Sequence, residues 1–303
     1  MTTQPTVIDE TGPIQATPIE VEPAGDRSRT LRRTLAYAFL IGYAILMLIP
    51  FLWQVVTSFK TDQDALQMTL VPDPFTLQGW ETAMTTLDPS IPQLFLNSTI
   101  VAAGVMVCNV VLASMAGYAF ARLRFPGREV FFLLILGTLM IPDQLRFVPV
   151  YLIERQLGLI TRQPWNYLGV ILILAIEAQQ LFLMRQYFLT IPRDLEEAAK
   201  IDGAGFFTTF LRVMVPLATP AIAAVAILSF QGAWNGFFWP LLILQEQSHW
   251  TLPLGLFSLT QEFLTFWPAL MAVTVAAILP ILVIYVFFQR YFVASVAASG
   301  VKG

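Results

Sequence analysis

Residues 185–216 read RQYFLTIPRDLEEAAKIDGAGFFTTFLRVMVP, a polar segment that interrupts a chain made mostly of long apolar runs. Within it, Pro192 and Asp194 precede the acid-alanine run 196–199, and Gly203 follows four residues after that run. Because glycine favours a helix end and a polar cap favours a start, we expect a short helix that is capped by Asp194. Its alanines predict a docking helix with a small-residue surface; on composition alone, a solvated connector is the alternative.

Most of the remaining chain is apolar. Hydrophobic residues make up 56% of the 303 positions, charged residues make up 12%, and the mean hydropathy is +0.68. This composition is typical of an integral membrane protein. The single Cys108 excludes an internal disulfide and is expected to be a small buried thiol.

The sequence also lacks the motifs of several catalytic classes. It contains no GxxxxGK[ST] phosphate loop and no paired Cys/His spacing for a metal. We therefore expect no ATPase site, no catalytic residue, no cofactor site and no metal site in this chain, and no nucleic-acid partner.

Six apolar stretches are long enough to cross a bilayer as helices, which takes about 20 residues. Asp143 and Arg146 interrupt the third stretch, but their i, i+3 spacing allows them to pair on one face. Prolines predict kinks in the fifth stretch (Pro220, Pro240) and in the sixth (Pro268, Pro280). The six spans are expected at residues 34–59, 96–121, 130–152, 165–184, 215–244 and 267–289.

The two ends of the chain are expected to lie outside the membrane domain, which runs over residues 34–293. Residues 1–33 contain four prolines and no apolar periodicity, which predicts a disordered tail without an assigned function. The first span is longer than the apolar core of a signal peptide and should be retained. Residues 294–303 form a C-terminal tail.

Positive charges divide unequally between the two sides of this six-span arrangement. Thirteen of the 17 Lys and Arg residues fall on the side of both termini, and four fall on the other side. Since Lys and Arg concentrate on the cytoplasmic side, both termini and residues 185–216 should be cytoplasmic. The loops after the first span and at residues 245–266 should be external.

The spacing within residues 185–216 resembles a family signature. Glu-Ala-Ala at 197–199, then Gly203 and Pro216, resemble the EAA coupling loop of ATP-binding-cassette importer permeases, which is EAA, three residues, G, nine residues, I-x-L-P. Val213 and Val215 replace the usual Ile and Leu, a mild departure.

Other stretches are similar to one branch of that family, the second permease subunit of carbohydrate importers of the maltose and glycerol-3-phosphate type. The resemblance covers residue 34 to the last residue and implies a type I importer permease fold, with six transmembrane helices and a cytoplasmic coupling helix. The similar stretches are Asn97-Ser98, YAFARLRFPG at 118–127, TLMIP at 138–142 with Gln144, Pro149 and Tyr151, and GVKG at 300–303.

The resemblance also implies the partners and the place of the protein. They are a homologous second permease, two cytoplasmic ATPases that hold ATP and Mg, an extracytoplasmic sugar-binding protein and the bilayer of a prokaryotic cell membrane. The chain itself would be a transducer and not an enzyme, and its C-terminal residues could reach along the ATPases. The implied ATPase-coupling residues are Glu196, Glu197, Ala198, Ala199, Asp202 and Gly203, with Pro216 closing the connector.

Polar residues inside the fourth and fifth spans are candidates for a sugar path, because polar groups in membrane helices are costly and usually face a cavity. Gln231, Trp234 and Asn235 share one helix face, where an indole could stack on a sugar ring. Interhelical hydrogen bonds are the alternative role. The complete candidate set is Glu177, Gln179, Gln180, Gln231, Trp234 and Asn235, and Glu177 departs from the family pattern.

In the external loop at residues 245–266, the resemblance implies a contact with the binding protein. The residues concerned are Thr251, Leu252, Pro253, Leu254 and Gly255. His249 is expected to be an exposed loop residue, and Trp239, Trp250 and Trp267 are expected to be interfacial anchors.

Two other functions remain open at this level. An importer permease for another solute, such as a phosphodiester or a polyamine, would share the EAA loop. A proton-coupled carrier or channel would instead use Glu177 and Asp143. The sequence does not name the transported sugar.

Overall fold

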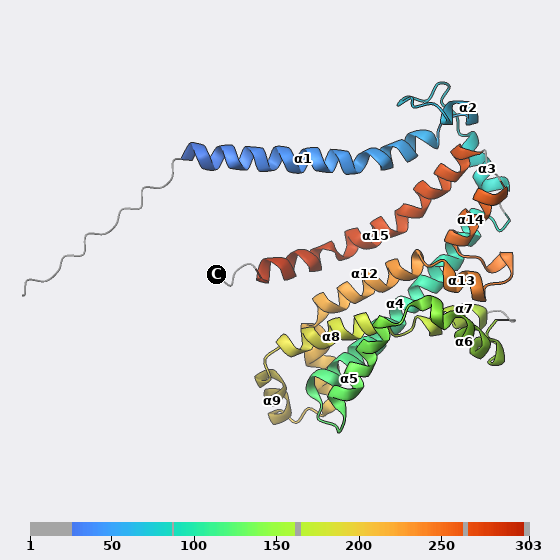
Figure 1. Cartoon of the computed structure of the whole chain (residues 1–303). Coiled ribbons are helices and arrows are strands. Elements are labelled where there is room, and N and C mark those ends of the chain that lie inside the picture. The colour runs from blue at the N-terminus through green and yellow to red at the C-terminus, as the bar shows by residue number, and fades with distance from the viewer. Residues whose placement is uncertain (1–25, 87, 161–164, 263–265, 300–303) are drawn as a thin grey trace, which may run out of the picture. The chain divides into compact units, whose positions relative to one another are not determined.

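The computed structural model describes residues 26–86, 88–160, 165–262 and 266–299, and regular structure in these ranges is helical throughout (Figure 1). Residues 1–25 and 300–303, which belong to the two predicted tails, lie outside the described residues. The helices are α1 (Asp26–Thr57), α2 (Asp62–Ala65), α3 (Gln78–Thr86), α4 (Ile91–Arg122), α5 (Arg128–Gly137), η1 (Thr138–Met140), α6 (Asp143–Gln156), α7 (Trp165–Ile173), α8 (Ala178–Thr190), α9 (Asp194–Ile201), α10 (Phe206–Thr209), the π-helical η2 (Phe210–Met214), α11 (Val215–Leu217), α12 (Thr219–Trp234), α13 (Phe238–Ile243), η3 (Gln247–His249), α14 (Leu252–Glu262) and α15 (Trp267–Ser299).

Helix α1 begins earlier than the sequence predicts. It starts at Asp26, so residues 26–33 are helical and the prediction of disorder for them is wrong. The reason is local: these residues follow the last proline of the tail, Pro23, and four of the eight are Arg, which is a good helix former.

Among the residues that the structure describes, three helices are long and apolar enough to cross a membrane, and three bent helix pairs raise the possible number of spans to six, as predicted. The continuous candidates are Arg29–Thr57, Ile91–Arg122 and Trp267–Phe287. The bent pairs are α5 and η1 with α6 at 105°, α7 with α8 at 55°, and α10 to α11 with α12 at 78°.

The breaks only partly follow the prolines. The break in the fifth span lies at Ala218, two residues before Pro220 in the first turn of α12, where a kink was predicted. In the sixth span α15 instead runs on through Pro280 as one helix. The breaks in the third and fourth spans were not predicted, and the fourth contains no proline between Trp165 and Thr190.

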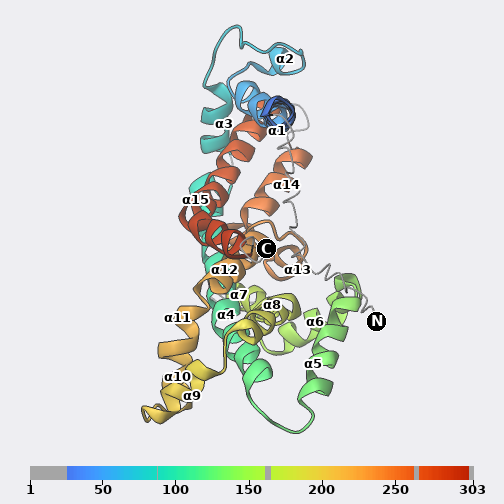
Figure 2. The ribbon, with the colours of Figure 1, turned by 90° about the vertical axis from the view of Figure 1, so that its left-hand side faces the viewer.

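Helix α4 forms the centre of the packed part of the chain, with α8 and α12 against it (Figures 1 and 2). Gly117 lies where α4 crosses α8: a Cβ at this position would be 2.6 Å from the Cβ of Met184, so any larger residue would force the helices apart. Cys108 on α4 was expected to be buried, but it is partly exposed.

Two apolar clusters hold these helices together. One joins Leu94 and Val101 of α4 with Trp234 of α12 and Val273 of α15. The second cluster joins α4, α8 and the segment after α9. Its largest members are Tyr118, Met184, Phe188, Phe210 and Met214.

Candidate functional site

The acid-alanine run forms α9, as the sequence predicts, and Figure 1 shows this helix at one end of the α4, α8 and α12 bundle. Asp194 is its first helical residue and Arg193 precedes it as the cap residue, so the prediction of an Asp194 cap is wrong. Asp194 acts instead through its charge, because acidic groups in the first turn favour the positive end of the helix dipole.

Gly203 ends α9 in a left-handed turn with φ 81°, the conformation that glycine adopts at little cost. The Gly203 N–H donates to the Lys200 carbonyl at 3.0 Å, and the Ala204 N–H donates to the Ala199 carbonyl at 2.9 Å. These two bonds form a Schellman motif. They turn the chain back toward the membrane domain.

The two adjacent glutamates of α9 have different surroundings. Glu196 is buried, and its Oε1 lies 3.0 Å from Nε of Arg122 at the end of α4. The Tyr118 hydroxyl donates to Glu196 Oε2 at 3.2 Å. Glu197, by contrast, is exposed.

Arg122 connects three elements at this point. Besides its ion pair with Glu196, it donates to the carbonyl oxygens of Phe188 and Ile191 at the end of α8. Neither Arg122 nor Tyr118 was among the predicted site residues, although a cation at the end of an apolar span is a usable signal. Together these contacts fasten α9 to α4 and α8.

The outer face of α9 combines small residues with charge. Ala198, Asp202 and Gly203 are exposed beside Glu197, whereas Ala199 is buried. A recess of about 260 Å³ adjoins this face. Its lining residues are Arg122, Arg124, Arg193, Glu196, Glu197 and Lys200.

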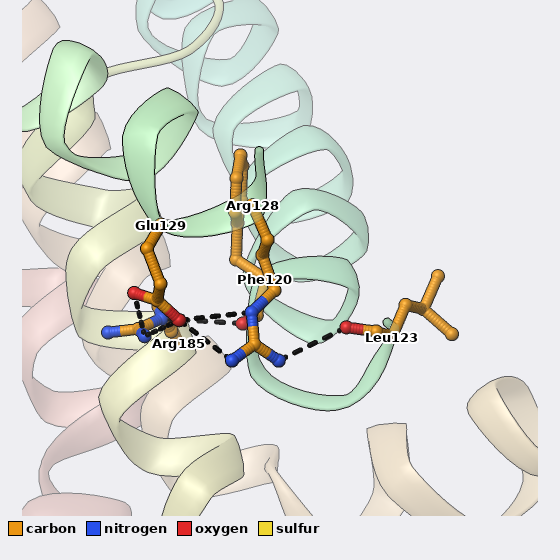
Figure 3. A network of polar contacts seen from close by, with 5 residues as sticks. All are labelled: Phe120, Leu123, Arg128, Glu129 and Arg185. Carbon is orange, nitrogen blue, oxygen red and sulfur yellow. Dashed lines mark hydrogen bonds and ion pairs between the residues drawn. The ribbon is translucent and has the colours of Figure 1, made fainter. Parts of the chain in front are cut away.

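A second charged cluster lies nearby, at the junction of α4, α5 and α8 (Figure 3). Arg185 of α8 reaches Glu129 Oε2 of α5 at 3.2 Å, and Arg128 reaches Glu129 Oε1 at 2.7 Å. Arg128 also donates to the Leu123 carbonyl at 3.1 Å. Because the Glu129 side chain is 56% exposed, this cluster contributes less than the Arg122–Glu196 pair.

The polar residues of the fourth span lie at its break. Glu177 is the cap residue of α8, Gln179 is exposed, and Gln180 is buried. Glu177 and Gln179 line a cavity together with Asp143 and Arg146, which form the predicted i, i+3 ion pair.

The three polar residues of the fifth span do not share one environment. Trp234 is buried, stacks on Phe230 and donates its Nε1–H to the Ala277 carbonyl of α15 at 3.1 Å. Its ring therefore has the interhelical role and is not free to stack on a sugar. Gln231 and Asn235 are exposed and remain path candidates.

The loop after α13 packs back onto the bundle. His249 is buried, with Nδ1 2.6 Å from Nδ2 of Asn166 on α7, so the prediction that it is an exposed loop residue is wrong. Asn97 of α4 holds the same turn, because its Nδ2 donates to the Ser248 and Trp250 carbonyls at 2.9 Å. The three-residue helix η3 thus folds inward, which local sequence does not show.

The five residues implied to contact a binding protein are mostly covered by the chain itself. Pro253 is partly exposed and the other four are buried; the Leu252 N–H donates to Ser98 Oγ at 2.7 Å. The contact stays a prediction; elsewhere in the same loop, residues 245–248 are exposed. Trp239, expected to be an interfacial anchor, is buried against Phe147 at 5.0 Å between ring centroids.

Comparison with known proteins shows which proteins resemble this chain in sequence. The pattern of the family described as "Binding-protein-dependent transport system inner membrane component" matches residues 109–298. The arabinooligosaccharides transport system permease protein AraQ of Halalkalibacterium halodurans is 35% identical, over 89% of this chain and 97% of that protein. The diacetylchitobiose uptake system permease protein NgcG of Streptomyces coelicolor is 34% identical over 87% of each. The sn-glycerol-3-phosphate transport system permease protein UgpE of Agrobacterium fabrum is 32% identical, over 88% of this chain and 96% of that protein.

Solved structures show the same fold. A chain of a bacterial ABC transporter involved in the import of the acidic polysaccharide alginate superposes with a TM-score of 0.75, at 24% identity, over 89% of this chain and 99% of that chain. The similarity extends over nearly the whole membrane domain, so the architecture is that of a type I importer permease.

Proposed function

Because this chain belongs to the family of binding-protein-dependent transport system inner membrane components, we propose that it forms half of the translocation pathway of an ATP-driven carbohydrate importer. A homologous second permease supplies the other half. Two cytoplasmic ATPases hydrolyse ATP, and an extracytoplasmic binding protein delivers the sugar. This chain carries no catalytic step itself.

The observation that carries this proposal is that one glutamate of α9 is exposed while its neighbour is buried against α4. Glu197 and Ala198 face outward, where a carboxylate can meet a cation of an ATPase and a small side chain allows close approach. Glu196 faces inward and binds Arg122 of α4. A displacement of α9 is therefore passed to the spans.

The path of that displacement follows the packing. Arg122 also binds the end of α8, and the cluster of Tyr118, Phe188 and Phe210 fills the space between α4, α8 and η2. Pro216 lies in α11, directly before the bend into α12. Movement of α9 by the closing ATPases thus reaches α4, α8 and α12 together and drives alternating access.

The proposed solute class follows from the relatives. Their names refer to arabinooligosaccharides, diacetylchitobiose and sn-glycerol-3-phosphate, which are sugars or a related polyol phosphate. A carbohydrate is therefore the substrate that we propose. These names include both uncharged and anionic solutes, so they leave the charge of the substrate open.

The first experiment reverses the exposed charge of α9. In the complex co-expressed with its partner permease and ATPases, Glu197→Lys should abolish co-purification of the ATPases and sugar uptake, because it places a cation against the cation of the partner. Glu81→Lys makes the same change at an exposed residue of α3, on the predicted external side, and should leave the ATPases bound. Normal ATPase binding in Glu197→Lys would contradict the proposal.

The second experiment separates the importer from a proton-coupled carrier. In proteoliposomes of the complete complex, uptake should require ATP and the binding protein and should continue when a protonophore collapses the proton gradient. Uptake by the purified chain alone, lost on addition of the protonophore, would establish the carrier instead.

A further inference from the structure

The break in the fourth span has no cause in its own sequence. Helix α7 ends at Ile173, α8 begins at Ala178, and the two helices are bent by 55°. Residues 174–177 read LAIE, without proline or glycine, and Leu, Ala and Glu are good helix formers. Sharp kinks without such residues arise where a side chain inserts into the backbone hydrogen-bond ladder. The break should therefore be imposed by another helix.

Asn109 of α4 supplies the inserted side chain. It is completely buried; its Nδ2 donates to the Leu174 carbonyl at 2.6 Å, and its Oδ1 accepts from the Glu177 N–H at 3.0 Å. In a continuous helix these two backbone groups would bond to residues 178 and 173. Because backbone polar groups in a membrane must find partners within the protein, one amide makes the open break tolerable.

The surroundings of Asn109 select an amide. Its Nδ2 also donates to the Val105 carbonyl of its own helix at 3.1 Å, so both N–H groups are used. Two carbonyl oxygens thus face Nδ2 and one N–H faces Oδ1. An aspartate would lack the donors, and an apolar side chain would leave all three backbone groups without this partner.

The inner half of the span, α8, is fastened to α9. Arg122 donates to the carbonyl oxygens of Phe188 and Ile191 at the end of α8 and pairs with Glu196 of α9. Figure 1 shows α8 leading toward α9. A displacement of α9 therefore acts on α8 directly.

The outer half, α7, is fastened to the predicted external loop instead. Asn166 Nδ2 lies 2.6 Å from Nδ1 of His249, and the Tyr167 hydroxyl donates to Asn97 Oδ1 at 2.8 Å. The same Asn97 binds the loop carbonyls. The break thus separates a half that is bound to α9 from a half that is bound to the loop.

We propose that Asn109 is a positioning residue for transport: it keeps the break open as a hinge, at which α8 pivots with α9 while α7 stays with the external loop. The inference rests on the proposed importer function, which supplies the motion. It adds the residue that determines where the fourth span bends.

The test measures one distance within the fourth span. In a Cys108→Ser background, nitroxide labels at Trp165→Cys and Gln186→Cys, two exposed positions on α7 and α8, report it by pulsed electron paramagnetic resonance. The complex with its partner permease and ATPases is compared without nucleotide and after trapping with ATP and vanadate. The distance should change by about 2 Å or more, the scale of helix shifts in switching proteins. Labels at Leu96→Cys and Met115→Cys, both exposed on the continuous α4, are the control and should not move apart.

Replacing Asn109 should remove the hinge. Asn109→Leu has a side chain of similar branched shape without polar atoms, so residues 165–186 should close into one helix with about 32 Å between the labelled backbones in both states. Ser114→Ala is the matched control on α4. It removes a buried hydroxyl that has no hydrogen-bond partner among the described residues, and the nucleotide-dependent change should persist.

A proline distinguishes a hinge from packing. Glu177 has φ −105° and ψ 137°, the conformation that the residue before a proline prefers, and Ala178 is the first residue of α8, where proline is favoured. Asn109→Leu combined with Ala178→Pro should therefore reopen the break and restore the distance change, although no bond of Asn109 returns.

The outcomes separate this inference from the importer function. A distance change that persists in Asn109→Leu, or that Ala178→Pro does not restore, overturns the hinge. If Asn109→Leu does not assemble, the double variant should recover assembly, and failure to do so means that Asn109 serves packing alone. An unchanged distance in a parent complex that hydrolyses ATP also refutes the hinge but not the importer, whereas a parent chain that binds no ATPase refutes the importer function.

Discussion

At the scale of single residues, two neighbouring glutamates differ in role. Successive residues on an α-helix are about 100° apart, so Glu196 turns toward Arg122 while Glu197 turns to the outside. The sequence assigned both to the same docking surface. We therefore assign Glu196 as a positioning residue that acts through α4 and keep Glu197 as the proposed contact.

Breaking this buried pair should destabilise the chain. Arg122→Gln leaves the Glu196 carboxylate without its cation, and removal of one partner of a buried pair costs about 3–5 kcal/mol. Thermal unfolding in detergent should show the loss, and ATP hydrolysis in the complex should continue with reduced transport per ATP.

The control for this prediction replaces both partners. Arg122→Met with Glu196→Leu removes the two charges together and should recover most of the unfolding temperature, since no uncompensated charge remains. Transport per ATP should recover less than stability does. Full recovery of both would mean that the pair serves stability alone.

At the scale of elements, the contact between α4 and α8 depends on the absence of a side chain at Gly117. A Cβ there would lie 2.6 Å from Met184 Cβ and 2.9 Å from the Arg185 backbone nitrogen, and backbone cannot move aside cheaply. The same two helices carry the Arg122 contacts. Their spacing therefore affects both stability and coupling.

Gly117→Ala should lower the free energy of unfolding by about 1–3 kcal/mol, the usual cost of overpacking. Gly232→Ala is the matched control, because nothing lies within 4 Å of the Cβ position of Gly232 in α12. That change should be neutral or stabilising by up to about 1 kcal/mol, since Ala favours helix over Gly. Unfolding curves of the two variants in one detergent compare them directly; similar curves would contradict the close contact.

At the scale of the whole molecule, the charge distribution predicts which loops face the cytoplasm. Asp202 follows α9 on the predicted inner side, and Gln247 lies in the external loop; both are exposed. In the Cys108→Ser background, a membrane-impermeant maleimide should label Gln247→Cys in intact spheroplasts and Asp202→Cys only in inside-out vesicles. The reverse pattern would invert the proposed topology and remove α9 from the reach of ATPases.

The sequence by itself determined the class of the protein, the possible six spans and the existence of α9. These follow from local composition and from short spacings such as 197–199 to Gly203, which act within one segment of chain. Membrane spans are also easier to predict than the elements of other proteins, because about 20 apolar residues are enough to indicate a span.

The tertiary structure alone decided which side chains face inward and where the spans break. The Arg122–Glu196 pair joins residues 74 positions apart, and Asn109 holds a break 68 positions away through the Glu177 N–H. His249 was expected outside and is buried for the same reason, since its partner is Asn166 on another helix. Such contacts depend on which helices meet, and no local pattern contains that information.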